Sequence, residues 1–413
     1  MATPVEKRHR ALDGLRAVAI GLVFAEHFGG FLPGTLGVDV FFVLSGYLIT
    51  GLLISERDRR GKVAFRSFYR RRTLRLMPAY LVMTAFTVVA AGTLGGDGSA
   101  SLARQGVARS LTYTSNIATA LHRWDAETPR LWEFTWSLAA EEQFYLLWPV
   151  LLVLGLRLAR TEQARLLLGA FPFAGFLAST LWSYHLIAAH APVMRIAVAP
   201  DTRSGGLLLG CAVAIWQSTL RGRPVAYWGT ALARWGGLLL GVAVLWQYPR
   251  GSGYSQARLS PVMAAATALV ILAVTSPGRS RSLTSTILSL RPVAFVGRLS
   301  YSLYLYNVLG LLLFEFGEQQ GWIRVAHGLR PVVAALMALA MAYLSYRWVE
   351  QPFLRRRERV RPKAVASSGP ARARSVESHD ELRRRSGPHG LRGALVPALQ
   401  AGEEIPGGAS GRL

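Results

Sequence analysis

The sequence predicts an all-α protein that crosses a membrane with about ten helices, and three observations support this fold class. Of its 413 residues, 51% are hydrophobic and 17% are charged, whereas about a quarter of a soluble globular protein is charged. Ten apolar stretches have the roughly 17 to 25 residues that cross a bilayer. Arginine and lysine are also distributed unequally between alternate connections.

The predicted spans and their connections give the orientation of the chain. With the N-terminus in the cytoplasm, the inner segments carry 28 arginines and lysines and the outer segments carry 10. Because basic residues are enriched on the cytoplasmic side, we expect a multi-pass protein of the cell membrane with both termini in the cytoplasm. The helices are expected near residues 11–31, 36–54, 79–95, 132–154, 166–190, 204–220, 229–248, 259–276, 293–315 and 331–350.

The C-terminal end differs in composition from the rest. Residues 1–354 are predicted to form one membrane-embedded domain, and residues 355–413 a basic cytoplasmic tail. The tail is rich in Gly, Ser, Pro and Arg, so it cannot bury enough apolar surface to offset its ordering entropy, and we expect it to be disordered. Its arginines are expected to contact anionic lipid headgroups rather than nucleic acid. The single cysteine, Cys211, excludes an internal disulfide, and no Cys/His cluster has metal-site spacing.

In the stretch RALDGLRAVAIGLVFAEHFGG, the first span begins after Arg10 and carries four ionisable residues, which are unfavourable in hydrocarbon unless paired or functional. Asp13 and Arg16 are three residues apart and can form an ion pair, so Asp13 has either a structural or a functional role. Arg16 and His27 return to nearly the same helix face, about 16 Å apart along the axis. We expect His27 to act in catalysis, because histidine exchanges protons near neutral pH. The alternative is that it caps the helix or meets a carboxylate.

Further polar residues are expected in an outer layer of the membrane. Glu141 and Glu142 lie side by side in WSLAAEEQFYLLWP, so at least one of them should be paired, protonated or functional. Adjacent side chains point about 100° apart, so one carboxylate can serve the chemistry while the other holds a neighbouring helix. The remaining members of this layer are Asp39, Asp201 and Arg203.

An inner layer is expected around residues 68–80, FYRRRTLRLMPAY. Topology alone predicts arginines at this position, but their density exceeds what topology requires. Together with two tyrosines, these arginines suit a phosphorylated ligand that carries a ring. The residues concerned are Tyr69, Arg70, Arg71, Arg72, Arg75 and Tyr80.

Seven motifs follow one another through about residues 9 to 354. They are Arg16 and His27 with ten residues between them, GVDVFFVLSGYLIT, FYRRRTLRLMPAY, WSLAAEEQFYLLWP, PDTRSGGLLLG, GRLSYSLYLYN and WVEQPF. In this order they resemble the acyltransferase-3 family of integral-membrane O-acyltransferases. The resemblance implies ten membrane helices, an acyl-CoA donor, and transfer of a short acyl group to a hydroxyl, commonly on a sugar.

The resemblance also implies which residues act. It gives an essential role to Arg16, His27, Glu141 and Glu142, and extends to Arg72, Arg75 and Arg203. Family members often carry histidine at two positions that are Phe134 and Asn307 here, so a mechanism that needs a second histidine is not expected. Asn307 can still position substrate through hydrogen bonds.

The expected mechanism combines both lines of reasoning. His27 is the general base for the acceptor hydroxyl, and Glu141 or Glu142 orients its imidazole. Direct transfer and a covalent acyl-histidine are both open. Arg16 and the arginines of residues 70–75, which are Arg70, Arg71, Arg72 and Arg75, are expected to hold the phosphates of acyl-CoA. Acyl-CoA is a co-substrate, and no permanently bound cofactor or metal is expected. The remaining substrate-binding residues are Asp39, Asp201, Arg203 and Asn307.

The acceptor is expected to be a sugar or a macrolide, and the acyl group an acetyl, propionyl or isovaleryl group. The start of the chain, KRHRALDGLRAVAIGLVFAEHF, resembles the antibiotic-modifying branch of the family. One alternative is O-acetylation of a cell-surface polysaccharide. Another is a transporter of a sugar-containing molecule, although the broken helices in matching halves that mark many carriers are not evident in the sequence.

Overall fold

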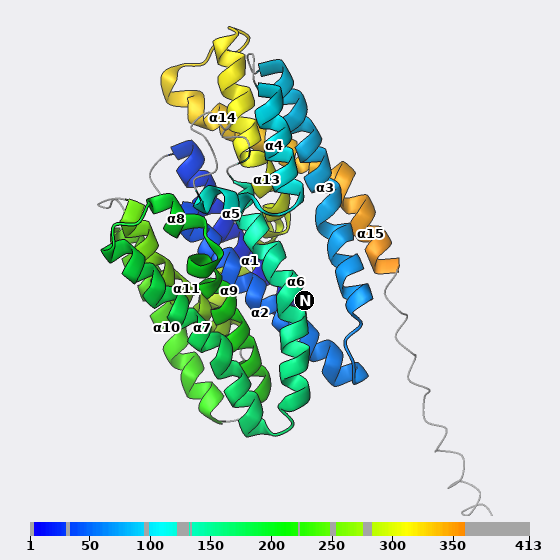
Figure 1. The fold of residues 1–413 in the computed structure, drawn as a ribbon, viewed down its shortest axis with the longest axis vertical. Helices are drawn as coiled ribbons and strands as arrows, with labels where there is room; N and C mark the ends of the chain where they lie inside the picture. The colour runs from blue at the N-terminus through cyan, green and yellow to red at the C-terminus, as the bar shows by residue number, and fades with distance from the viewer. Residues whose placement is uncertain are drawn as a thin grey trace, which may run out of the picture. The chain divides into compact units, whose positions relative to one another are not determined.

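The structure is a computed structural model, and it describes residues 4–29, 34–94, 99–121, 132, 134–221, 224–247, 253–275 and 283–359. Every regular element within these ranges is helical (Figure 1), so the predicted all-α fold is confirmed. Helix α15 (Gln351–Arg359) continues across the predicted domain boundary. The rest of the predicted tail lies outside the described residues.

A helix covers each of the ten segments that were predicted to span the membrane. Within the described residues, seven helical segments are long and apolar enough to cross a bilayer, and these involve α2, α3, α6, α7, α11, α13 and α14. The ten helices are α1 (Pro4–Phe24), α2 (Gly34–Arg60), α3 (Phe65–Leu94), α6 (Thr135–Leu158), α7 (Glu162–Ala188), α9 (Pro200–Thr219), α10 (Pro224–Gln247), α11 (Gly253–Thr275), α13 (Arg291–Gln319) and α14 (Arg330–Ser345).

Shorter helices occupy several connections. They are α4 (Ser99–Leu111), α5 (Ser115–Ala120), α8 (Val193–Val198), α12 (Leu283–Leu288) and the 3₁₀ turn η4 (His327–Leu329). Two π-helical turns, η1 (Ala25–Gly29) and η5 (Tyr346–Glu350), follow directly on α1 and α14. A π turn changes the direction in which the next side chains point and is frequent at functional sites. Both turns belong to motifs that the sequence analysis singled out.

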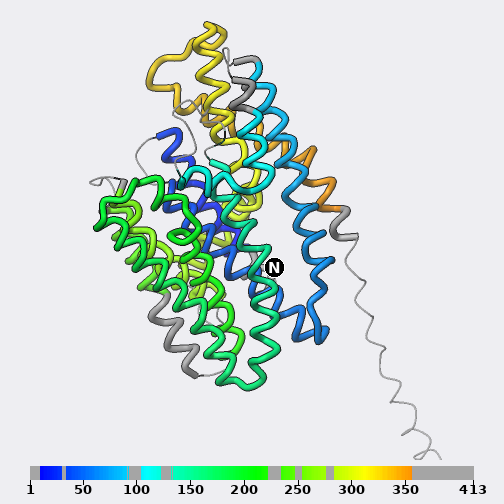
Figure 2. Tube along the Cα trace, in the orientation of Figure 1, coloured from blue at the N-terminus to red at the C-terminus, as the bar shows by residue number. Residues whose placement is uncertain are grey.

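Helices α1 and α2 lie between two groups of helices (Figures 1 and 2). On one side α2 packs on α9 and α11, and α9 packs on α7. On the other side α1 packs on α13, which in turn packs on α14. The charged first helix is therefore surrounded by protein, as the cost of exposing charge to lipid requires.

Glycines allow two of these helix crossings. A Cβ atom on Gly46 of α2 would lie 1.9 Å from the carbonyl oxygen of Leu207 in α9. A Cβ atom on Gly297 of α13 would lie 1.7 Å from the carbonyl oxygen of Asp13 in α1. Only glycine lets the backbones approach this closely, so these positions fix how α2 and α13 present their side chains.

Candidate active site

An open cavity, which we call the arginine cavity, lies where α1, α2, α3, α6 and α13 meet. On α2 the lining residues are Val38, Phe41, Phe42 and Ser45, which share one helix face by their spacing. The other polar side chains that line it are Arg16, Arg72, Arg75, Ser137, Glu141, Tyr145, Ser300, Tyr301 and Tyr304.

Three consecutive residues of α6 bind three different neighbours beside this cavity. Glu141 accepts a hydrogen bond of 2.5 Å from the hydroxyl of Ser45 on α2. Glu142 binds α3, and Gln143 exchanges hydrogen bonds of 2.9 and 3.1 Å with Asn116 of α5. Consecutive side chains on a helix point about 100° apart. The two carboxylates therefore have different contacts. Glu141 lies in the cavity wall, and Glu142 binds a neighbouring helix, as predicted for one of the pair.

The partner of Glu142 is Arg72. The Arg72 Nε donates to the two carboxylate oxygens at 3.0 and 3.2 Å, and Nη2 donates to Oε1 at 2.5 Å. The guanidinium also lies over the ring of Tyr145, 3.2 Å from its centroid. Contacts on the plane and the edge of the guanidinium fix its orientation.

This ion pair corrects one sequence-based expectation. Glu142 and Arg72 were predicted to lie in opposite layers of the membrane, and the hydrogen bonds between them show that this separation is wrong. The charge count along the chain assigns each helix end to one side of the membrane. It does not give the depth of a residue within the helix, nor the reach of a long arginine side chain.

Two further arginines belong to the same cavity. Arg16 Nη1 lies 3.3 Å from Asp13 Oδ1, which confirms the ion pair predicted from their spacing. Arg75 follows Arg72 by one helical turn and also lines the cavity. Three of the five arginines that were predicted to hold the donor are thus brought together, with Glu141 in the same wall. Arg70 and Arg71 do not line this cavity within the described residues, and Arg71 Nη2 lies 3.6 Å from Glu56 Oε2.

His27 lies on η1 and is not among the described residues that line this cavity. Its Nδ1 is 2.8 Å from the carbonyl oxygen of Val23. Because a carbonyl oxygen only accepts, Nδ1 is the donor in this hydrogen bond. The expected contact between His27 and Glu141 or Glu142 is wrong, because those carboxylates bind α2 and α3.

The remaining ionisable residue of the first span, Glu26, binds the start of α2. Its carboxylate accepts hydrogen bonds from the backbone N–H groups of Gly34 and Thr35, which is the role of a helix N-cap. Arg16 precedes Glu26 along α1, and Ser45 follows Gly34 along α2. By the helical rise, both residues lie about 16 Å from the cap. His27 is next to the cap and therefore lies about 16 Å from Arg16, whereas Val38, which lines the same arginine cavity, is only four residues from Gly34.

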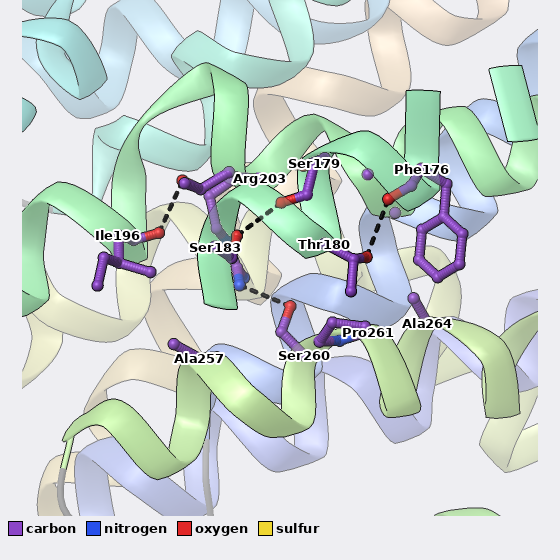
Figure 3. A pocket seen from close by; sticks show the side chains of 13 residues that line it. Phe176, Ser179, Thr180, Ser183, Ile196, Arg203, Ala257, Ser260, Pro261 and Ala264 are labelled. Atoms are coloured by element: carbon purple, nitrogen blue, oxygen red, sulfur yellow. Dashed lines mark hydrogen bonds between the residues drawn. The ribbon is translucent and has the colours of Figure 1, made fainter. Parts of the chain in front are cut away.

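A second cavity lies between α7, α9 and α11 (Figure 3). Arg203 lines it, and its Nη2 lies 2.8 Å from Asp39 Oδ1, with the two side chains only 5% and 4% exposed. Ser260 of α11 accepts from Arg203 Nη1 at 2.8 Å (Figure 3) and donates to Asp39 Oδ1 at 2.8 Å. Within the described residues, Asp39 Oδ2 and Arg203 Nε have no hydrogen-bond partner. This buried, incompletely satisfied pair joins α2, α9 and α11.

One aromatic residue of the first cavity lies near Arg203, which lines the second. Phe42 lines the first cavity, and the Arg203 guanidinium lies 5.9 Å from the centroid of its ring. Trp136 packs edge-on against Phe42 and lies 5.5 Å from the same guanidinium. The Asp39–Arg203 pair thus stands directly behind the wall of the arginine cavity.

Asp201 faces away from this pair, although it is close to Arg203 in the sequence. It accepts hydrogen bonds of 2.5 and 2.9 Å from Arg195 and one of 2.8 Å from Trp182. Burial raises the pKa of Asp201, but the hydrogen bonds from Arg195 and Trp182 outweigh it and hold this pKa below its usual range. The Asp201 side chain is 43% exposed and lines neither cavity within the described residues.

The two positions at which the family often carries histidine meet at Tyr304. The Tyr304 hydroxyl donates to the Phe134 carbonyl oxygen at 3.0 Å and bonds the Ser137 hydroxyl at 2.5 Å. Asn307 is 1% exposed, and its Nδ2 donates to the Tyr304 carbonyl oxygen at 3.0 Å. Asn307 Oδ1 has no hydrogen-bond partner within the described residues. Asn307 does not line the cavity, whereas Tyr304 does.

Several polar residues of the site were not identified from the sequence. Ser45 and Tyr145 lie inside quoted motifs, and their spacing from Phe41 and Glu141 on the same helices could have indicated them. Ser260 gives no such signal, because it is an uncharged polar residue in an apolar stretch. Glu350 lies in the WVEQPF motif and is 5% exposed.

Comparison with known proteins agrees with the motifs. The chain is 29% identical over 353 residues to the peptidoglycan O-acetyltransferase OatA of Listeria monocytogenes, covering 83% of this chain and 55% of the relative. It is 31% identical over 362 residues to the O-acetyltransferase OatA of Staphylococcus aureus, and this match covers 83% of this chain and 56% of that relative. The chain spans about half the length of these curated relatives. No solved structure matches it.

A family profile gives the assignment. The profile described as Acyl_transf_3, Acyltransferase domain, matches residues 9–347, which include the arginine cavity, the acidic pair and His27. Because this match covers most of the chain, the protein belongs to the acyltransferase-3 family that its motifs resemble.

Proposed function

We propose that this protein is a membrane O-acyltransferase that moves an acetyl group from acyl-CoA to a hydroxyl of a cell-surface glycan. The observation that carries the proposal is the cavity that gathers Arg16, Arg72, Arg75 and Glu141 in a chain of the acyltransferase-3 family. The relatives carry the names of O-acetyltransferases, but the match covers only 55% and 56% of their length. Donor and acceptor are therefore part of the proposal.

The phosphates of the donor bind on the arginine side of the cavity. Arginine binds phosphate through several N–H groups in a fixed plane. Arg72 is already oriented by Glu142 and Tyr145, so little entropy is lost when its remaining N–H groups bind. The contact of 3.3 Å from Arg16 to Asp13 is longer, which lets Arg16 turn toward a phosphate.

The reactive end of the donor extends toward His27. Arg16 and His27 are about 16 Å apart along α1, which the flexible pantetheine arm can span. The unprotonated Nε2 of His27 takes the proton of the acceptor hydroxyl as its oxygen attacks the thioester carbonyl. The C–S bond then breaks, the proton passes to the leaving sulfur, and the products are the acyl ester and free CoA.

A glycan is the preferred acceptor. One of the relatives is named for peptidoglycan, which supports the polysaccharide alternative of the sequence analysis. Neither relative supports the macrolide acceptor or the antibiotic-modifying branch, so we do not propose them. With both termini in the cytoplasm, the His27 end of α1 would face the outer side, where such a glycan lies.

The test is acetyl transfer by purified protein in lipid vesicles, with radiolabelled acetyl-CoA and either peptidoglycan fragments, a macrolide or no acceptor. We expect label on the peptidoglycan fragments, and loss of transfer in Arg16→Ala but not in Arg298→Ala, an exposed arginine of α13. Label on the macrolide alone would refute the glycan acceptor. Movement of a glycan across the vesicle membrane without label would instead indicate a transporter.

A further inference from the structure

Glu350 is a buried carboxylate that the proposed reaction does not use. It is the last residue of the π turn η5, and it is 5% exposed. The hydroxyl of Ser302 on α13 donates a hydrogen bond to it. One bond from a neutral hydroxyl does not offset the loss of hydration of a buried carboxylate, which needs a cation.

The basic residue that the packing brings near Glu350 is Arg75. Helix α3, which carries Arg75, packs against η5 and α15, and the positive charge of Arg75 favours the ionised form of the Glu350 carboxylate. One residue after Arg75, the carbonyl oxygen of Leu76 accepts a hydrogen bond of 2.8 Å from the hydroxyl of Tyr301. This bond fixes α3 against α13 at the height of Arg75.

Adjacent residues of α13 contact the arginine cavity and Glu350. Ser300 and Tyr301 line the arginine cavity, whereas Ser302 turns to Glu350. Arg75 itself lines the cavity, and Glu350 is not among the described residues that do so. Glu350 therefore stands behind Arg75, on the side opposite to the place proposed for the donor.

The arrangement repeats the one found around Arg72. The two arginines are one helical turn apart on α3, and both line the cavity. Glu142 of α6 binds the first, and Glu350 belongs to η5, which packs against α3 beside the second. An acidic residue from a different element thus accompanies each arginine.

We propose that Glu350 is a positioning residue that holds the Arg75 guanidinium at the cavity wall in the orientation that binds a donor phosphate. The proposal rests on the donor site proposed above. It assigns a role to the WVEQPF motif, which lies far from the arginines in the sequence. Support of this kind for a binding residue changes affinity by about 10- to 100-fold when it is removed from comparable sites.

The test is a double-mutant cycle with Glu350→Gln, Arg75→Gln and the double variant. Glutamine keeps the size of Glu350 and its bond from Ser302 but removes the charge. We expect Glu350→Gln to raise KM for acetyl-CoA about tenfold with kcat within about twofold, because only donor binding depends on Arg75. The double variant should be no weaker in donor binding than Arg75→Gln alone, since Glu350 acts through Arg75.

Glu318→Gln is the matched control, because Glu318 is a carboxylate of α13 that pairs with Arg330 at 2.6 Å and lines neither cavity within the described residues. We expect its KM to equal that of the wild type. Additive effects of the two glutamine substitutions, or an unchanged KM in Glu350→Gln, would overturn the proposal. If Glu350→Gln does not fold, the double-mutant cycle is measured with Glu350→Asp in its place.

Binding of coenzyme A alone separates this proposal from the proposed function. If the wild type does not bind coenzyme A, as measured by calorimetry on the purified protein, the donor assignment fails together with this inference. If the wild type and Glu350→Gln bind coenzyme A equally, the donor assignment stands and only the role of Glu350 is wrong.

Discussion

The guanidinium of Arg72 and the carboxylate of Glu142 are joined by three donor–acceptor contacts of 2.5 to 3.2 Å. The two side chains are 18% and 22% exposed, so the pair is largely withdrawn from water. Seventy residues separate them in the sequence, and the bond connects α3 to α6 at the wall of the cavity. Its energy depends on both partners being present.

We therefore expect Glu142→Ala to lower the free energy of unfolding by about 3 kcal/mol, because it leaves a buried arginine uncompensated. The double variant Arg72→Met with Glu142→Leu should recover most of this stability, since apolar side chains of similar volume replace both charges. Thermal unfolding in detergent measures both. A double variant as unstable as Glu142→Ala would show that the loss comes from packing and not from the unpaired charge.

His27→Ala should reduce acyl transfer by a factor on the order of 100, because the proposed general base is removed. Membrane insertion and thermal stability should stay close to wild type, since the imidazole makes one hydrogen bond, to a carbonyl oxygen of its own helix. His185→Ala is the control, because this exposed histidine stacks on Trp182 outside both cavities. Near-normal kcat in His27→Ala would leave His27 with a structural role.

Asp39→Asn should destabilise the protein by about 3 kcal/mol, because the Arg203 charge would remain buried without its counter-ion. Asp201→Asn makes the same chemical change at an exposed ion pair, and should cost no more than about 1 kcal/mol. The difference between the two unfolding temperatures measures the effect of burial. Equal losses would contradict the interpretation of Asp39 as the buried partner of Arg203.

The predicted orientation can be checked by single-cysteine labelling after Cys211→Ala. Lys62→Cys lies between α2 and α3 and should react with a membrane-impermeant thiol reagent only from the cytoplasmic side, because the inner connections carry the excess of basic residues. Leu121→Cys, at the exposed end of α5, should react only from the outer side. The reverse pattern would overturn the orientation and the proposed access of the glycan to His27.

The helical fold and several of the residues that line the cavity could be predicted, because these predictions depend on local sequence. Apolar length specifies a spanning helix, and a helix was found on every predicted segment. Arg16, Arg72 and Arg75 were expected to act together, and they line one cavity. Glu141 was expected in the outer layer beside His27, and it lines the cavity of the arginines instead. Their selection from the sequence rested on the unfavourable burial of charge, which leaves few alternatives in a membrane.

The pairing of charges could not be predicted in the same way. Spacing gave the Asp13–Arg16 bond, since both residues lie on one helix. It did not give Arg195 as the partner of Asp201, or exclude Glu142 as a partner of His27, because these depend on the rotation and depth of separate helices. The π turn that carries His27 adds a further change of direction that periodicity does not reveal.

The three consecutive polar residues of α6 also limit how the length of the chain can vary. Inserting or deleting one residue between Thr135 and Glu141 would rotate the following part of α6 by about 100° and shift it by 1.5 Å. Ser45, Arg72 and Asn116 would then all lose their partners at once. Length changes are tolerated in surface connections, where no such set of bonds depends on phase. The number of residues in the first two turns of α6 is therefore fixed by these bonds. Homologous chains should differ in length before or after this segment but not within it.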